Sequence, residues 1–249
     1  MRILMINPNT TESVTQRMLA AGRHAAAPAT ELVPLTAPRG VPYVATRTEA
    51  QIGGTIVLEM LAEHHAGSDA AIIAAFGDPG LMAARELFDL PVIGLAEAAM
   101  LTACMLGRAF SIVTFARALG PWYRECVALH GLTSRLASIR MLDGTFRSIS
   151  DVQEEKEELL VSLANKAVYE DEADVVIFAG GPLAGLADRV KDRIPVPVVD
   201  QAAAAVKLAE ALCALKPRKA QAGTFRRPDA KATTGLAGAL ARRIEHKDQ

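Results

Sequence analysis

Two short turns are the places where this sequence could carry out chemistry. The first, Gly77-Asp78-Pro79-Gly80, follows a run of apolar residues and precedes a segment with the composition of a helix, residues 81–87. Glycine and proline force the turn and leave backbone N–H groups free at the start of the helix, where an anion could bind. Asp78 is the ionisable residue of this turn and a candidate acid or base, and capping the helix that follows is an equally good role for it.

The second turn repeats the pattern of the first. Without a gap, Asp69 aligns with Asp174 and Ala75 aligns with Gly180. Each copy is followed by a helix, by an apolar strand that begins with proline, and by an alanine-rich helix. Any two strand–turn–helix units look somewhat alike, but the same order of elements in both copies favours an internal duplication. Two related halves would place two equivalent strand ends on opposite sides of a cleft.

The elements around these turns predict an α/β fold with parallel sheets. Continuous apolar runs are typical of strands that helices cover on both faces. Besides the second copy after Asp174, we predict such strands at residues 2–6, 31–35, 70–76, 91–95, 109–115, 137–142 and 195–200. Residues 1–98 together with 208–249 would form the first half, and residues 99–207 would form the second.

Polar residues gather where other predicted strands end. Asn7 and Thr10 follow the first strand, and Thr114 ends a strand that corresponds to it in the second half. Ligands bind at this edge of open α/β sheets, although capping of the next helix would also explain Asn7 and Thr10. The loop at residues 40–49, which holds Tyr43, is either a lid over the cleft or an ordinary connection.

The last part of the chain differs from the rest. It is basic from residue 216 onward and rich in glycine, threonine and alanine. Packing over the first half, partial flexibility and contact with another subunit are all possible for it. We favour packing, because Leu236, Leu240 and Ile244 are spaced as one apolar helix face.

Composition excludes several kinds of partner. Of the 249 residues, 51% are hydrophobic and 4% are aromatic, and the net charge is -1. We therefore expect neither nucleic acid nor an acidic membrane surface as the main partner. No apolar run approaches the roughly 20 residues of a membrane helix. The N-terminus leads directly into a strand rather than a signal peptide, so we expect a soluble cytoplasmic protein.

The cysteines give no sign of a disulfide or a metal site. Cys104, Cys126 and Cys213 are odd in number, far apart and set in helical sequence. They have neither the CxxC pattern nor a Cys/His metal spacing, so we expect reduced thiols and no metal.

Several motifs carry a resemblance to a known family. In chain order they are Asn7-Pro-Asn-Thr10, Phe76-Gly-Asp-Pro-Gly-Leu81, Pro91-Val-Ile-Gly94, Phe110-Ser-Ile-Val-Thr114 and Pro197-Val-Val-Asp200. Together they resemble the aspartate/glutamate racemase superfamily and, within it, the hydantoin and allantoin racemase branch. The resemblance implies two pseudo-symmetric, flavodoxin-like halves with the active site in the cleft between them. It also implies an enzyme that uses no cofactor and commonly forms homo-oligomers.

The sequence departs from this family at its catalytic positions. Family members use two cysteines, one from each half, to take a proton from a carbon next to a carbonyl and return it on the opposite face. Their positions correspond here to Ala75 and Gly180, so both thiols are missing. Of the remaining cysteines, Cys104 and Cys213 are expected in the core, whereas Cys126 could reach the cleft. Ordinary racemisation by two thiols is therefore not expected.

The resemblance still implies a site for a small carboxylate or a cyclic ureide. Asn7, Thr10 and Thr114 would hold the oxygens of the substrate, and Gly77, Gly180 and Gly181 would present N–H groups, next to Phe76 and Tyr43. We predict an isomerase whose acid or base is Asp78, with Tyr43, Glu49 and Glu97 as further candidates.

The missing thiols also fit three different interpretations. A binding protein could have kept the cleft and lost the chemistry. Ala75 could be an engineered replacement of the first cysteine, but that change alone would not explain the absence of the second cysteine at Gly180. A lyase similar to arylmalonate decarboxylase, which works with a single cysteine in the second half, would lack that cysteine here.

Overall fold

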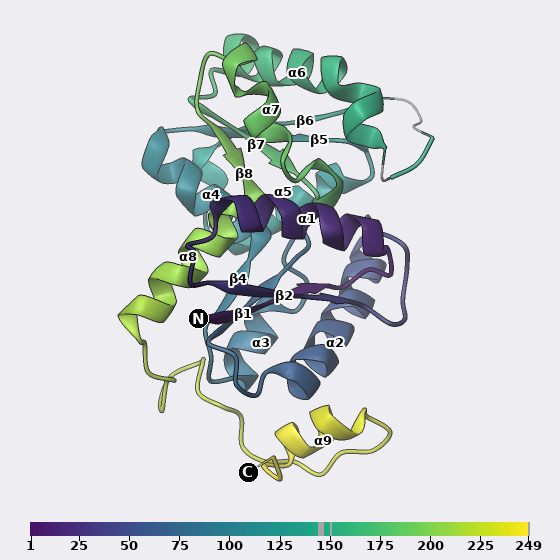
Figure 1. Cartoon of the computed structure of the whole chain (residues 1–249), viewed down its shortest axis with the longest axis vertical. Helices are drawn as coiled ribbons and strands as arrows, with labels where there is room; N and C mark the ends of the chain where they lie inside the picture. Colours follow the sequence, from purple (N-terminus) through teal and green to yellow (C-terminus); the bar gives the residue numbers. More distant parts are fainter. Residues whose placement is uncertain (144–146, 150, 249) are drawn as a thin grey trace.

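The first half of the chain forms one four-stranded parallel sheet. The structure, a computed structural model, describes residues 1–143, 147–149 and 151–248 (Figure 1). The strands of the first sheet are β1 (Arg2–Asn7), β2 (Glu31–Thr36), β3 (Ala70–Ile73) and β4 (Val92–Gly94), in the order β2-β1-β3-β4. Its helices are α1 (Glu12–Ala25), α2 (Arg47–His64), α3 (Leu81–Leu87) and α4 (Leu95–Leu106).

The second half repeats this arrangement. Its strands are β5 (Phe110–Thr114), β6 (Leu136–Met141), β7 (Val175–Ala179) and β8 (Val198–Asp200), in the order β6-β5-β7-β8, and all are parallel. The helices that follow β5 are α5 (Leu119–Leu129), α6 (Val152–Asp171), α7 (Leu186–Val190) and α8 (Gln201–Leu215), and α9 (Gly238–Ile244) lies in the tail. Short 3-10 turns cover Thr133–Arg135, Gly181–Leu183 and Lys191–Arg193. The predicted α/β fold with two parallel-sheet halves is confirmed.

Two strand ends differ from the sequence prediction. The strand predicted at residues 70–76 ends at Ile73, because the chain turns back on itself three residues later. There the N–H of Asp78 donates to the carbonyl of Ala75. Asn7, expected in a loop, is the last residue of β1 and pairs with Thr36 of β2.

Two alanine-rich helices join the halves. Helix α4 contacts α8, and Figure 1 shows both in the region between the two sheets. Helix α4 also lies against β7 and β8 of the second sheet, whereas α8 lies against β3 and β4 of the first. Their buried faces consist largely of alanine, whose small side chain allows close approach. One continuous apolar core therefore extends from β1 to β7.

The tail lies on the far face of the first sheet, where α9 contacts α2 (Figure 1). Leu240 is buried there and Ile244 is partly buried, but Leu236 precedes the helix and is exposed. Arg243 is also buried and donates two hydrogen bonds to the carbonyl of Leu87. The exact residues that divide the halves, and the assignment of the tail to the first of them, stay predictions.

Within the described residues, none of the helices combines the length and the apolar character that crossing a membrane requires.

Candidate functional site

A small cavity lies between the two halves, next to the ends of β3 and β7. Its volume is about 30 Å³. Five residues proposed from the sequence line it: Tyr43, Ala75, Phe76, Gly180 and Gly181. Its other lining residues are Asn9, Val44, Ala74, Phe115, Tyr123 and Pro182. The positions of the two absent cysteines therefore share one cavity, as the duplication predicts for equivalent turns.

Asn7 supports this cavity without lining it. Its side chain is fully buried, and its amide nitrogen donates to Asn9 Oδ1 at 3.1 Å and to Thr15 Oγ1 at 2.9 Å. Its own oxygen accepts the N–H of Asn9. Thr10 does not line the cavity either, and its N–H donates to the carbonyl of Val41. Both residues thus fix the backbone of the turn after β1.

Asn9 is the polar side chain that the cavity receives from this turn. Its Oδ1 accepts hydrogen bonds from Asn7 Nδ2 and from the N–H of Thr11, which defines the orientation of the amide. Among the described residues none accepts a hydrogen bond from Asn9 Nδ2, so this donor is available to a ligand. Asn9 belongs to the same four-residue motif as Asn7, but the spacing alone did not show which of the two asparagines faces the cavity.

The turn at Gly180 is held by side chains on two sides. The side-chain amide of Gln201 accepts the N–H of Gly180 and donates to its carbonyl. Gln153 donates to the carbonyls of Pro182 and Ala184 at 2.9 and 2.7 Å. Both glutamines are buried. The sequence pattern did not single them out, and their only signal is a polar residue within an otherwise apolar segment.

Aromatic rings occupy the space above both glycine turns. A Cβ atom on Gly180 would lie 2.5 Å from Cε1 of Phe115, and the φ angle of Gly180 is 108°. In the first half, a Cβ atom on Gly77 would lie 2.3 Å from the ring of Trp122. Position 180 therefore has no room for a side chain of any kind while Phe115 stays in place.

Thr114 and Tyr123 form the polar wall behind the cavity. Thr114 is fully buried, and its Oγ1 donates to the carbonyl of Ala179 at 3.0 Å. Burial raises the pKa of Tyr123 far above its usual value, so its phenol stays protonated.

Asp78 does not line the cavity. Its carboxylate is completely buried and accepts the N–H groups of Ala96 and Glu97, both at 2.8 Å. Asp78 therefore caps α4 rather than α3, the helix that follows it directly. Burial raises its pKa, while His130 and the two N–H groups oppose this effect.

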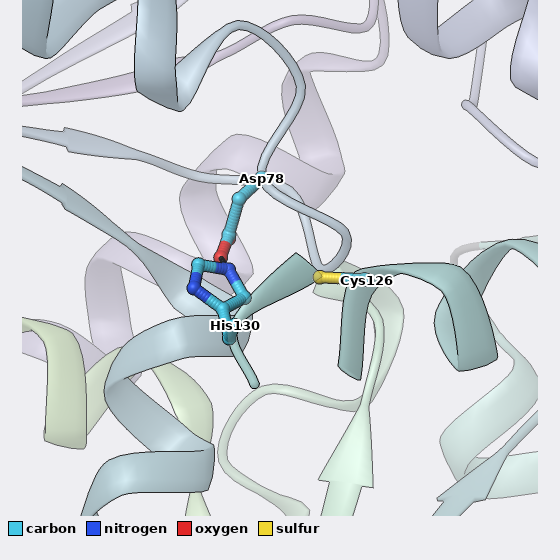
Figure 2. Close-up of side chains that lie close together, drawn as sticks. All are labelled: Asp78, Cys126 and His130. Atoms are coloured by element: carbon cyan, nitrogen blue, oxygen red, sulfur yellow. Dashed lines mark ion pairs between the residues drawn. The ribbon is translucent and has the colours of Figure 1, made fainter. Parts of the chain in front are cut away.

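A row of ionisable side chains continues from Asp78, beginning with His130 (Figure 2). His130 Nε2 lies 3.3 Å from Asp78 Oδ2, and His130 Nδ1 lies 3.6 Å from Glu97 Oε1. Glu97 in turn accepts two hydrogen bonds from the guanidinium of Arg85. The sequence could not show this row, because its members come from three separate segments.

The remaining candidate acid/base residues have different surroundings. Glu49 accepts the N–H groups of Ala45 and Thr46 and completes a capping box at the start of α2. Glu97 is paired with Arg85. Tyr43 is the one candidate of the four that lines the cavity.

The cysteines lie outside the cavity. Cys126 is buried beside Asp78 and Glu97, and burial together with these carboxylates raises the pKa of its thiol. Cys104 and Cys213 are partly exposed and pack against the core.

Comparison with known proteins agrees with this architecture. The family described as Asp/Glu/Hydantoin racemase matches residues 3–209. A hydantoin racemase of Paenarthrobacter aurescens is 33% identical over 233 residues, which cover 93% of this chain and 99% of that protein.

Solved structures give the same result. An allantoin racemase from Klebsiella pneumoniae has a TM-score of 0.90 and 35% identity, with 96% of this chain and 98% of that chain covered. An allantoin racemase from Pseudomonas fluorescens has a TM-score of 0.87 and 34% identity, with coverages of 94% and 100%. Since the family match covers most of the chain, the protein belongs to the Asp/Glu/hydantoin racemase family.

Proposed function

We propose that the cavity between the halves binds a small cyclic ureide or carboxylate, and that this family member does not racemise it by the two-base route. The observation that carries the proposal is the combination of an oriented amide donor, Asn9, with Ala75 and Gly180 at the two positions of the proton-transferring thiols. Binding needs only a donor for a ligand oxygen, whereas racemisation needs a base on each face of the reacting carbon.

The amide donor of Asn9 suits a planar ligand with carbonyl or carboxylate oxygens, whereas the N–H of Gly180 is already bonded to Gln201. Asn9 Nδ2 would donate to one such oxygen. The rings of Phe76, Phe115 and Tyr123 would pack against the ligand. A carboxylate and the imide of a cyclic ureide both present these oxygens, which is why both classes remain in the proposal.

Access to the cavity would require movement of the loop that holds Tyr43 and Val44. A volume of about 30 Å³ accommodates one or two water molecules, which is much less than a five-membered ureide ring. The loop is fixed to the turn after β1 by the hydrogen bonds from Thr10 N to Val41 O and from Thr11 Oγ1 to Pro42 O. We infer that this loop is the lid considered from the sequence.

The second candidate function is isomerisation of a carbon acid without a cofactor, with an unusual acid or base. It is favoured by the position of Tyr43, an ionisable group at the cavity next to Ala75. Asp78 stays a weaker candidate, because both of its oxygens accept N–H groups of α4. A lyase would need a proton donor near position 180, where the residue is glycine. The expectation of a cytoplasmic homo-oligomer applies to either function.

Two measurements with one ligand panel test the proposal. Hydantoins, allantoin and amino acids are incubated with the protein in deuterated water, and loss of the α-proton is followed by NMR. Thermal shifts are recorded with the same compounds. We expect a thermal shift with at least one compound and no exchange above the buffer rate.

Asn9→Asp tests the donor with little change of shape. The variant keeps Oδ1 as the acceptor for Asn7 and Thr11 and removes the amide donor, so it should abolish the thermal shift. Asn165→Asp, in α6 and away from the cavity, is the matched control and should leave the shift unchanged. Exchange that Tyr43→Phe abolishes would establish the second candidate instead, and a panel without any thermal shift would contradict the binding proposal.

A further inference from the structure

Three potential metal ligands meet behind the cavity, at the end of α5. They are Asp78, from the turn after β3, and Cys126 and His130, four residues apart in the chain. One carboxylate oxygen, the thiol sulfur and one imidazole nitrogen all lie within 4.8 Å of one another. Figure 2 shows the carboxylate directed at the imidazole, with the thiol beside them on α5. None of the three lines the cavity between the halves.

The cluster contains a buried nitrogen that lacks a hydrogen bond. The His130 side chain is 5% exposed, and within the described part of the chain its Nε2 has no hydrogen-bond partner, although it faces Asp78. A buried polar atom without a partner is costly, and native proteins usually supply one in the form of a protein group, a water molecule or an ion. An ion bound by the members of the cluster would supply the missing partner of this nitrogen.

We propose that Asp78, Cys126 and His130 bind one divalent cation of the zinc type. Sulfur, imidazole nitrogen and carboxylate oxygen are the three donor types that bind zinc in proteins, whereas calcium and magnesium prefer oxygen donors alone. A carboxylate and a thiolate would balance the two positive charges of the ion. This inference is independent of the function proposed for the cavity.

The distances need only a small adjustment. With bonds to zinc of about 2.0–2.3 Å, ligand atoms of a tetrahedral site lie about 3.3–3.8 Å apart. Asp78 Oδ2 and His130 Nε2 already lie 3.3 Å apart. The widest separation in the cluster, at most 4.8 Å, would close by about 1 Å through rotation of side chains.

The surroundings of the cluster also suit a metal site. The carboxylate of Glu97 lies 3.6 Å from His130 Nδ1 and is held by Arg85. Metal-bound histidines commonly have such a carboxylate partner on their second ring nitrogen. The N–H groups of Ala96 and Glu97 orient the carboxylate of Asp78. On the outer side, Cys126 also lines a surface pocket of about 320 Å³, through which an ion and a water ligand could enter.

Cobalt(II) is the appropriate probe, because a cobalt–thiolate bond gives a charge-transfer absorption band in the near ultraviolet. The full chain, without a histidine tag, is freed of metal with a chelator and titrated with cobalt. We expect one ion per chain, a thiolate band, and displacement of the cobalt by zinc. Cys126→Ser should abolish the band. Cys104→Ser and Cys213→Ser are matched controls and should retain it.

Two histidine variants and one carboxylate variant complete the test. His130→Gln should weaken binding strongly, whereas His246→Gln, on the surface of the tail, should not. Glu97→Gln, which affects a positioning residue, should weaken zinc binding by about 10–100-fold and keep the thiolate band. The thermal stability of each variant without metal shows whether it is folded.

Absence of cobalt and zinc binding by the folded wild-type chain would overturn the proposal and leave the approach of His130 to Asp78 as a buried structural contact only. A thiolate band that disappears in Cys104→Ser or Cys213→Ser, and persists in Cys126→Ser, would overturn it as well.

Discussion

The carboxylate of Asp78 occupies in the first half the place that the side chain of Asp200 occupies in the second. The second half has one extra residue before β8, so Pro91-Val-Ile-Gly94 aligns with Pro197-Val-Val-Asp200 and Gly94 corresponds to Asp200. A Cβ atom on Gly94 would lie 2.2 Å from Cγ of Asp78. Asp78 accepts the N–H groups two and three residues after Gly94, and Asp200 accepts the N–H groups two and three residues after itself. The same cap is thus supplied from two different positions of the repeat.

This correspondence gives Asp78 a structural role that requires no chemistry. Asp78 comes from a turn and reaches across to the start of α4, whereas Asp200 precedes α8 directly. Retention of the turn motif around Asp78 is therefore not evidence that the chain still racemises.

Gly94→Ala should destabilise the protein by about 2–4 kcal/mol, because the methyl group displaces the carboxylate of Asp78 and leaves buried N–H groups of α4 without an acceptor. Chemical denaturation measures this loss. The double variant Gly94→Asp with Asp78→Gly, which moves the cap to its position in the second half and suits the φ of 51° at position 78, should recover most of the stability. If the double variant is less stable than Gly94→Ala, the two caps are not equivalent.

Gly180→Ala should cost about 2 kcal/mol or more, since its φ of 108° is unfavourable for other residues and its Cβ would meet Phe115. Gly223→Ala, at a φ of 77° with open space around it, should cost only about 1 kcal/mol. Ala75→Cys should be tolerated. Substitution should therefore lower the free energy of unfolding at position 180 but not at position 75. Equal stability of the Gly180 and Gly223 variants would contradict this explanation.

Gln201→Leu should destabilise the turn at Gly180, because both backbone groups of Gly180 lose their partner inside the core. The expected loss is about 2–4 kcal/mol in the free energy of unfolding. Gln221→Leu, in the exposed tail, is the control and should have no measurable effect. Hydrogen exchange of the Gly180 amide should accelerate in Gln201→Leu, and unchanged protection would argue against this role.

The tail should loosen in acid, because Asp248 joins two parts of it through Arg227 and Arg243. Burial alone raises the pKa of Asp248, but hydrogen bonds from Arg227 and Arg243 outweigh burial and lower the pKa to about 2. Because the unfolded pKa is about 3.9, this carboxylate contributes about 2 kcal/mol above pH 4, and the contribution disappears as the pH falls towards 2. Proteolysis of the tail by pepsin should therefore increase over this range.

Asp248→Asn should remove this dependence on pH, and the tail of the variant should be cleaved readily at pH 4 as well. Asp229→Asn, which affects an exposed pair with Arg226, is the control and should behave as the wild type. A tail that is equally resistant at pH 4 and pH 2 would refute the prediction.

The fold was predictable because it depends on apolar runs, which the sequence displays directly. The runs that contain Ile3 and Ile112 are buried on both faces, so their period and their flanking turns were sufficient. The end of β3 was not predictable, since Ala74 to Phe76 are as apolar as the strand itself. What ends the strand is a hydrogen bond between Ala75 and Asp78, which no hydrophobic pattern reveals.

The candidate site was predictable only in part. Ala75 and Gly180 face one cavity, as the duplication indicated. Phe115 and His130 were missed as neighbours of the site, because their roles depend on contacts with turns distant in sequence. The sequence did not distinguish Asn9 from Asn7, because both asparagines lie in one motif, two residues apart.

The exchange of α4 and α8 between the sheets makes the two halves interdependent for folding. Helix α4 follows β4 of the first sheet but lies against β7 and β8 of the second. Helix α8 follows β8 of the second sheet but lies against β3 and β4 of the first. A chain cut between the halves would therefore expose an apolar alanine surface on each fragment, and neither fragment would keep its complete core. Unfolding should accordingly occur as one cooperative transition, and the two halves should not fold as separate units.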